Sequence, residues 1–149
     1  MHTLKFAVAL LWLAFCFAKV EIAIEGKHGW AGDLPTWRLP ATHWVSRLFF
    51  AGRAATGYHV WLQLFVLGVF HLTYLFSPAT LPTELQILSF YMLFWVIEDF
   101  LWFVLNPDFG LKKFAKPNIP WHPNWWLFAP AEYFIFGVAG VALYLFASR

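Results

Sequence analysis

Two adjacent acids, Glu98 and Asp99, interrupt an apolar stretch of the chain that reads FWVIEDFLWF. A carboxylate near the middle of a bilayer costs roughly 2.5–3.5 kcal/mol even on lenient insertion scales. Acids that are kept despite such a cost commonly hold protons, a metal ion or a basic partner. We therefore expect Glu98 and Asp99 to belong to a functional site, as catalytic acids or bases if the protein is an enzyme.

Other acids and histidines are expected to gather at the same end of the molecule, because consecutive helices of an up-down bundle alternate in direction. The candidates are Glu21, Glu25, His28, His59, His122 and Glu132. Glu21 and Glu25 are four residues apart and share a helical face. Glu25 and His28 have the E-x-x-H spacing of carboxylate-bridged metal sites. Gly26 lies between them and no second E-x-x-H exists, so this signal is weak.

Three arrangements would offset these acids, and the sequence leaves all three open. Together with Glu98 and Asp99, the six candidates could ligate a hard divalent cation, Mg²⁺, Mn²⁺ or iron. Closely placed carboxyl groups could instead share protons and act as general acids and bases. Ion pairs with Lys19, Arg38, Arg47 or Arg53 would instead compensate the charges of the acids, and the acids would then have no catalytic or metal-binding role. Glu132 could also serve a helix first turn, and Glu21 and Glu25 could reach the membrane interface.

The composition indicates an integral membrane protein. Of 149 residues, 61% are hydrophobic and only 12% are charged, whereas soluble domains average about 45–50% apolar and about 25% charged residues. We expect a single all-α domain that covers residues 1–149. The net charge of +2 gives no reason to expect nucleic acid as a partner. Cys16 is the only cysteine, which excludes an intramolecular disulfide and a multi-thiolate metal site.

We predict four transmembrane helices in an up-down bundle, at residues 4–24, 54–76, 84–105 and 124–147. The first segment could be a cleaved signal peptide, but most basic residues follow its apolar run, which favours an uncleaved helix. Thr83 and Gln86 have capping-box spacing and predict a helix start at Glu84. Pro130 leaves open whether the fourth helix begins at that residue or before it. Residues 43–49 fit a short interfacial helix or a loop packed over the bundle end.

Basic residues concentrate in the first and third loops. They are Lys27, Arg38, Arg47, Arg53, Lys112, Lys113 and Lys116, whereas the other side has Lys5 and Arg149. The positive-inside rule then places loops one and three in the cytoplasm and both termini outside. We expect a plasma or inner membrane, with the candidate acids in its cytoplasmic leaflet.

Aromatic residues nearly surround the third predicted helix, beside the two acids. Flat rings next to acids suit a lipid-soluble ligand such as an isoprenoid chain, a sterol, a quinone or a carotenoid. Our leading hypothesis is a membrane protein that binds metal or protons and acts on, or holds, such a ligand. The alternatives are a non-catalytic subunit or scaffold of a membrane complex, whose acids pair with loop Arg and Lys residues, and a proton- or ion-coupled carrier. Apart from the bilayer, the sequence leaves open a homo-oligomer or a membrane complex as the partner. The chain has no Walker A loop, G-x-S-x-G or H-E-x-x-H motif.

Overall fold

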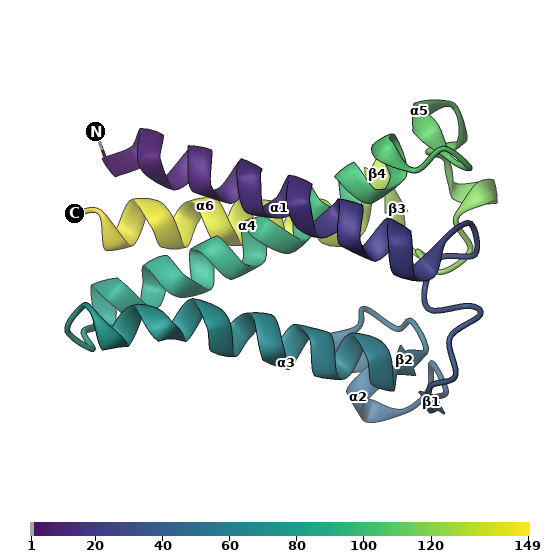
Figure 1. The fold of residues 1–149 in the computed structure, drawn as a ribbon, viewed down its shortest axis with the longest axis horizontal. Coiled ribbons are helices and arrows are strands. Elements are labelled where there is room, and N and C mark those ends of the chain that lie inside the picture. Colours follow the sequence, from purple (N-terminus) through teal and green to yellow (C-terminus); the bar gives the residue numbers. More distant parts are fainter. Residues whose placement is uncertain (1) are drawn as a thin grey trace.

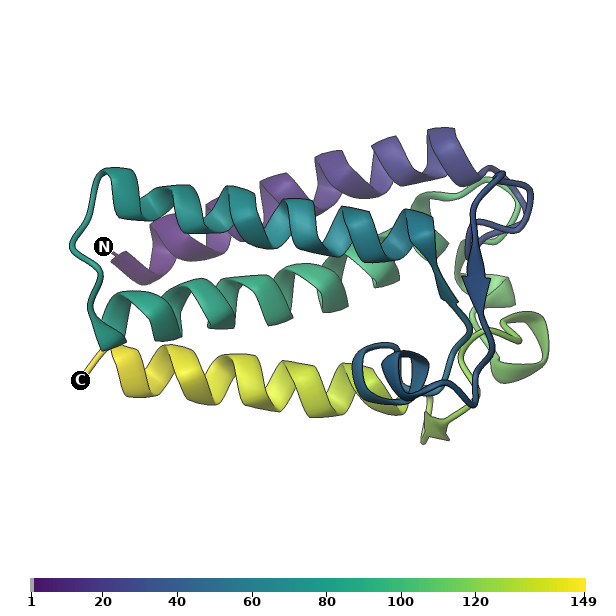
Figure 2. The same cartoon turned by 90° about the horizontal axis from the view of Figure 1, so that it is seen from below.

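The computed structural model describes residues 2–149, which are mostly helical. Within this range three helical segments are long and apolar enough to cross a membrane. They are α1 (His2–Glu25), α3 (Gly57–His71) with its 3-10 continuation η1 (Leu72–Leu75), and α4 (Leu81–Leu105). A fourth apolar helix, α6 (Ala131–Ala147), has 17 residues. Figures 1 and 2 show these four helices running alongside one another.

Helix α4 is central to the packing, because it contacts α6 and α1 extensively and α3 much less. Its approach to α6 is close at Gly140, where an added Cβ would lie 2.7 Å from Cγ of Leu93. At the same crossing the hydroxyl of Ser89 donates a hydrogen bond to the Gly140 carbonyl at 2.7 Å. The tight α4–α6 contact and the looser α3 leave room for a cavity on the α3 side of α4.

The two long connecting segments, between α1 and α3 and between α4 and α6, gather at the end of the molecule opposite both termini, whereas the short turn between η1 and α4 lies at the end of the termini (Figures 1 and 2). They contain two short antiparallel pairs, β1 (Arg38–Leu39) with β2 (Ala55–Thr56), and β3 (Trp125–Trp126) with β4 (Ala129–Pro130). They also contain the helices α2 (Trp44–Phe49) and α5 (Gly110–Lys113) and the 3-10 turn η2 (Lys116–Asn118). This end therefore holds most of the residues that lie outside the four long helices.

Helices α3, α4 and α6 begin at other residues than the sequence predicts. Helix α3 begins at Gly57 and not at residue 54. Helix α4 begins at Leu81, three residues before Glu84, because the Thr80 hydroxyl accepts a hydrogen bond from the Thr83 amide at 3.3 Å. Thr80 and not Thr83 is therefore the N-cap. Residues 124–130 form the β3–β4 hairpin, so that α6 begins only at Ala131, directly after Pro130.

Candidate functional site

A cavity of about 560 Å³ lies between α3, α4 and α6, bounded at the loop end by α1 and α2. Seven of the eight residues that the sequence singles out line it. They are Glu21, Glu25, His59, Glu98, Asp99, His122 and Glu132. The rest of the lining is mostly apolar and aromatic, and it extends along α4 from Leu88 to Phe103. The acids thus stand at one end of a long apolar cavity.

Glu98 and Asp99 face different neighbours, because adjacent residues on a helix point about 100° apart. Glu98 joins a group from α1 and α3 that we name the Glu98 cluster. Its members are Glu21, Glu25, Tyr58, His59 and Glu98. Asp99 joins a group from the loops and α6 that we name the His122 cluster. Its members are Arg53, Asp99, His122, Glu132 and Tyr133.

In the Glu98 cluster, carboxyl groups meet mainly neutral partners. The Tyr58 hydroxyl donates to Oε1 of Glu21 at 3.2 Å. The carboxyl groups of Glu21 and Glu98 lie within hydrogen-bonding reach of each other. Oε1 of Glu98 is buried and has no hydrogen-bond partner anywhere in residues 2–149. Two carboxyl groups in such contact repel unless they share a proton.

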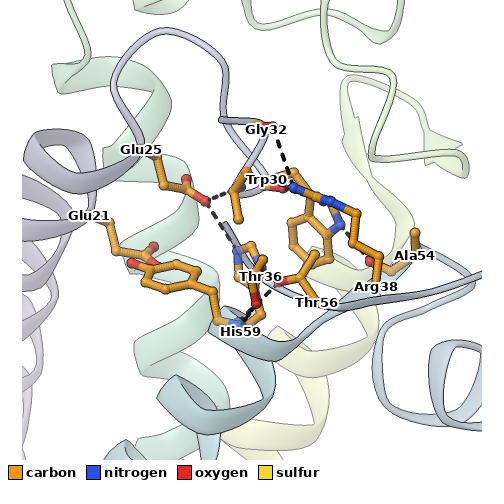
Figure 3. Close-up of polar contacts among 11 residues, drawn as sticks. Glu21, Glu25, Trp30, Gly32, Thr36, Arg38, Ala54, Thr56 and His59 are labelled. Atoms are coloured by element: carbon orange, nitrogen blue, oxygen red, sulfur yellow. Dashed lines mark hydrogen bonds and ion pairs between the residues drawn. The ribbon is translucent and has the colours of Figure 1, made fainter. Parts of the chain in front are cut away.

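Glu25 and His59 are held by the loop that follows α1 (Figure 3). Oε1 of Glu25 accepts a hydrogen bond from the Ala31 amide at 2.5 Å and lies 3.4 Å from Nε2 of His59. Nδ1 of His59 lies 2.7 Å from the Thr56 hydroxyl, and its ring stacks on Trp30 at 4.0 Å between ring centres. This loop therefore fixes both the carboxylate and the imidazole in orientation.

In the His122 cluster, every acid has a basic or hydroxyl partner. Nδ1 of His122 lies 2.7 Å from Oε1 of Glu132, and Nε2 lies 3.2 Å from Oδ2 of Asp99. The second contact is an ion contact that lacks the alignment of a hydrogen bond. Nη2 of Arg53 lies 3.7 Å from Oε1 of Glu132, and the Tyr133 hydroxyl donates to Oδ2 of Asp99. His122 is only 1% exposed, so its imidazole is shielded from water, whereas the Asp99 side chain is 28% exposed.

The surroundings of His122 favour its charged form. Burial lowers the pKa of its imidazole, but the Asp99 and Glu132 carboxylates outweigh burial and raise that pKa above its ordinary value. Two carboxylates next to one imidazole favour its doubly protonated, charged form over the neutral one. We therefore describe His122 as an imidazolium held between two carboxylates.

His28 is the one predicted site residue that the structure places elsewhere. Helix α1 ends at Glu25, and Gly26 follows with a positive φ of 63°. His28 therefore does not continue the helical face of Glu25; it is half-exposed and pairs with Asp33. No group of three His, Cys, Asp or Glu side chains in residues 2–149 is placed to hold a metal ion. The metal that the E-x-x-H spacing suggested stays a prediction without support from this geometry.

Several residues of the site have no signal in the sequence. Tyr58 and Tyr133 are each adjacent to a predicted candidate, but nothing about their spacing marks them as partners of carboxylates. Trp30 links the two clusters, since it stacks on His59 and the Arg53 guanidinium lies 4.3 Å from the centre of a Trp30 ring. These contacts depend on how the loops fold back over the helices.

Comparison with known proteins gives no further guide. No protein-family model, curated protein or solved structure matches this chain. The geometry and chemistry of the cavity therefore carry the functional argument alone.

Proposed function

We propose that this protein holds a lipid-soluble ligand in its cavity, with the polar end of the ligand against the two acid clusters. The observation that carries this proposal is the form of the cavity. Its lining follows α4 from Leu88 to Phe103, about 22 Å of helix at 1.5 Å per residue. Its volume of about 560 Å³ falls within the usual range for ligand pockets. A long apolar space with polar groups at one end matches an amphipathic molecule.

The proposal includes a membrane arrangement with four spans. Helices α1, α3 and α4 are long and apolar enough to cross, and we infer that α6 is the fourth span, at the short end of the usual range. The exposed apolar side chains of Trp44, Leu48 and Phe49 suit α2 to the membrane interface. By the positive-inside rule, the loop end and its acids then face the cytoplasm.

Glu98 is our candidate for acid–base chemistry on the ligand. It lines the cavity, lies against Glu21 and has a free carboxyl oxygen. A shared proton between two carboxyl groups can be given to, or taken from, a bound molecule. Asp99 is engaged by His122 and Tyr133, so we assign it to the support of the site.

Two observations favour ligand binding over a scaffold whose acids are ion-paired. Among the described residues, Arg53 with Glu132 is the one ion pair that joins an Arg or Lys to an acid. A scaffold held together by ion pairs also gives no reason for a large cavity. A carrier is less supported, because the acids of the site stand at one end and the remaining lining is mostly apolar.

The proposal is tested by organic extraction of the purified protein, followed by mass spectrometry of the recovered lipids. Val96 lines the cavity, and Val141 is exposed on α6 outside it. We expect Val96→Trp to fill part of the cavity and to remove a lipid that co-purifies with the wild type. Val141→Trp adds the same side chain outside the cavity and should retain that lipid. Equal lipid content in wild type and both variants would make the proposal wrong.

A further inference from the structure

Unpartnered buried polar atoms collect on the wall of the cavity. Oε1 of Glu98 and Nε1 of Trp102 have no hydrogen-bond partner in residues 2–149, and their residues are only 1% and 4% exposed. Nε1 of Trp95 is a third such atom; the Tyr91 hydroxyl is near it but is not aligned to accept. Leaving a buried polar group unpaired is costly, and native structures rarely do so without a reason.

These three residues share one face of α4. Trp95, Glu98 and Trp102 stand at positions i, i+3 and i+7, and all three line the same cavity. At 1.5 Å per residue, Glu98 is about 4.5 Å along the helix from Trp95 and about 6 Å from Trp102. Two unpartnered indole N–H donors therefore lie on the same helix face as an unpartnered carboxyl oxygen, one on either side of it along the helix.

We infer that the ligand is a neutral lipid alcohol, whose hydroxyl group accepts from an indole N–H and donates to Glu98. This inference rests on the proposed function and names its ligand class. A hydroxyl group is both donor and acceptor, so a single hydroxyl can form hydrogen bonds with an unpartnered indole N–H and with an unpartnered carboxyl oxygen. Oε1 of Glu98 has no partner in residues 2–149 and is therefore free to act as the acceptor.

Other polar ends fit this wall less well. A protonated amine cannot accept from an indole N–H, and Arg53 and His122 already supply positive charge beside the cavity. A carboxylate or phosphate would lie among the acids of both clusters. A quinone carbonyl or a hydrocarbon has no proton to donate to Glu98. The amine, the carboxylate and the hydrocarbon become competing outcomes of the test.

The volume of the cavity sets the length of the probe. At about 30 Å³ per non-hydrogen atom, the share that water has in the liquid, about 560 Å³ holds roughly 19 such atoms. A straight chain of about sixteen carbons with one polar end is therefore a suitable probe. Hexadecan-1-ol, hexadecane, hexadecylamine and hexadecanoic acid form a matched series in which only the end group changes.

The experiment measures retention of each compound, in tritiated form, by the full-length protein in nanodiscs against empty nanodiscs. We expect hexadecan-1-ol to bind about tenfold more tightly than each of the other three, as one or two hydrogen bonds made or lost would give. Equal or tighter binding of the alkane, amine or acid would overturn the alcohol while leaving the proposed function standing. If no compound is specifically retained, both the alcohol inference and the proposed function are wrong.

Single-residue variants test the two contacts directly. Trp102→Phe removes the indole N–H, and we expect it to weaken hexadecan-1-ol binding about three- to tenfold while hexadecane binding is unchanged. Trp61→Phe is the matched control, since Trp61 is exposed on α3 and lies outside the cavity lining. Glu98→Leu removes the acceptor oxygen altogether and supplies a second measurement should Trp102→Phe fail to fold, with the same selective loss expected. Wild-type alcohol binding in the folded variants would contradict the inference.

Discussion

Glu98 and Asp99 are neighbours in the chain, yet they belong to clusters of opposite character. In the His122 cluster the carboxylates of Asp99 and Glu132 are matched by His122 and Arg53, so two acids meet two basic groups. In the Glu98 cluster three carboxyl groups meet one imidazole and one phenol. In the His122 cluster the number of acids equals the number of basic groups. In the Glu98 cluster the acids outnumber the basic groups, and one carboxyl oxygen has no hydrogen-bond partner.

This difference shows that depth in a membrane does not by itself assign a role to an acid. A buried acid with a matched cation is costly to disturb, because removal of one partner leaves the other charge without compensation. A buried carboxylate among other carboxylates is destabilised by charge repulsion, and binding of a proton or of a ligand reduces that repulsion. We therefore assign the His122 cluster to the stability of the loop end and the Glu98 cluster to the ligand.

The largest effect is expected from removal of the shared cation. His122→Leu leaves both Asp99 and Glu132 without their imidazolium partner, and the loss of one partner of a buried ion pair costs about 3–5 kcal/mol. The free energy of unfolding in detergent, followed by tryptophan fluorescence, measures this loss. His28→Leu is the control, because the exposed pair of His28 with Asp33 should contribute less than about 1 kcal/mol. Equal losses in the two variants would mean that the His122 cluster is not the balanced one.

The two neighbouring acids should respond in opposite ways to neutralisation. Asp99→Asn removes the acceptor charge for His122 and Tyr133 and is expected to destabilise the protein by about 1.5–3 kcal/mol. Glu98→Gln relieves repulsion with Glu21 and is expected to leave stability unchanged or to raise it by up to about 1 kcal/mol. Unfolding of both variants under identical conditions checks the comparison. A Glu98→Gln variant less stable than Asp99→Asn would reverse our assignment.

Stability should fall as pH rises, through His122. Its pKa in the folded protein is raised above the ordinary value of 6.5, since the Asp99 and Glu132 carboxylates outweigh burial. The folded state then binds this proton more tightly than the unfolded state, so the stabilisation is complete below about pH 6.5. It is lost as pH rises through the folded-state pKa. The stability gap between wild type and His122→Leu should therefore shrink as pH rises above about 6.5, by less than the full effect of the substitution. A constant gap would show that His122 is not an imidazolium.

The common location of the acids could be predicted from the sequence, and their partners could not. Consecutive helices of an up-down bundle alternate in direction, so Glu21, Glu98 and Glu132 are expected at one end. Partner choice depends on loop geometry. The Ala31 amide reaches Glu25 because Gly29, Trp30 and Ala31 all adopt positive φ angles of 55°, 47° and 52°. No residue pattern predicts two consecutive left-handed residues that are not glycine.

Local ambiguity explains the remaining differences. Thr80 and Thr83 are both suitable N-caps, and the sequence pattern alone favoured the wrong one. The E-x-x-H spacing of Glu25 and His28 places both side chains on one face only if the helix continues through His28, but α1 ends at Glu25 and Gly26 follows with a positive φ. Nothing in the sequence indicates that the indole N–H groups of Trp95 and Trp102 lack partners, because only the arrangement of all four long helices shows it. Buried atoms that lack a hydrogen-bond partner can be identified only from a three-dimensional structure.

The smallest effect is expected at Trp30, the residue that touches both clusters. Its indole N–H donates to the Ala54 carbonyl at 2.7 Å, while its rings stack on His59 and carry the Arg53 guanidinium. Trp30→Phe keeps an aromatic ring but removes the hydrogen bond, so a loss of about 0.5–1.5 kcal/mol is expected. Trp126→Phe, at an exposed tryptophan, should change stability by less than about 0.5 kcal/mol. If Trp30 couples the clusters, the effects of Trp30→Phe and His122→Leu will not add in the double variant. Strict additivity would show that the two clusters are independent and that the proton of His122 has no influence on the Glu98 side of the cavity.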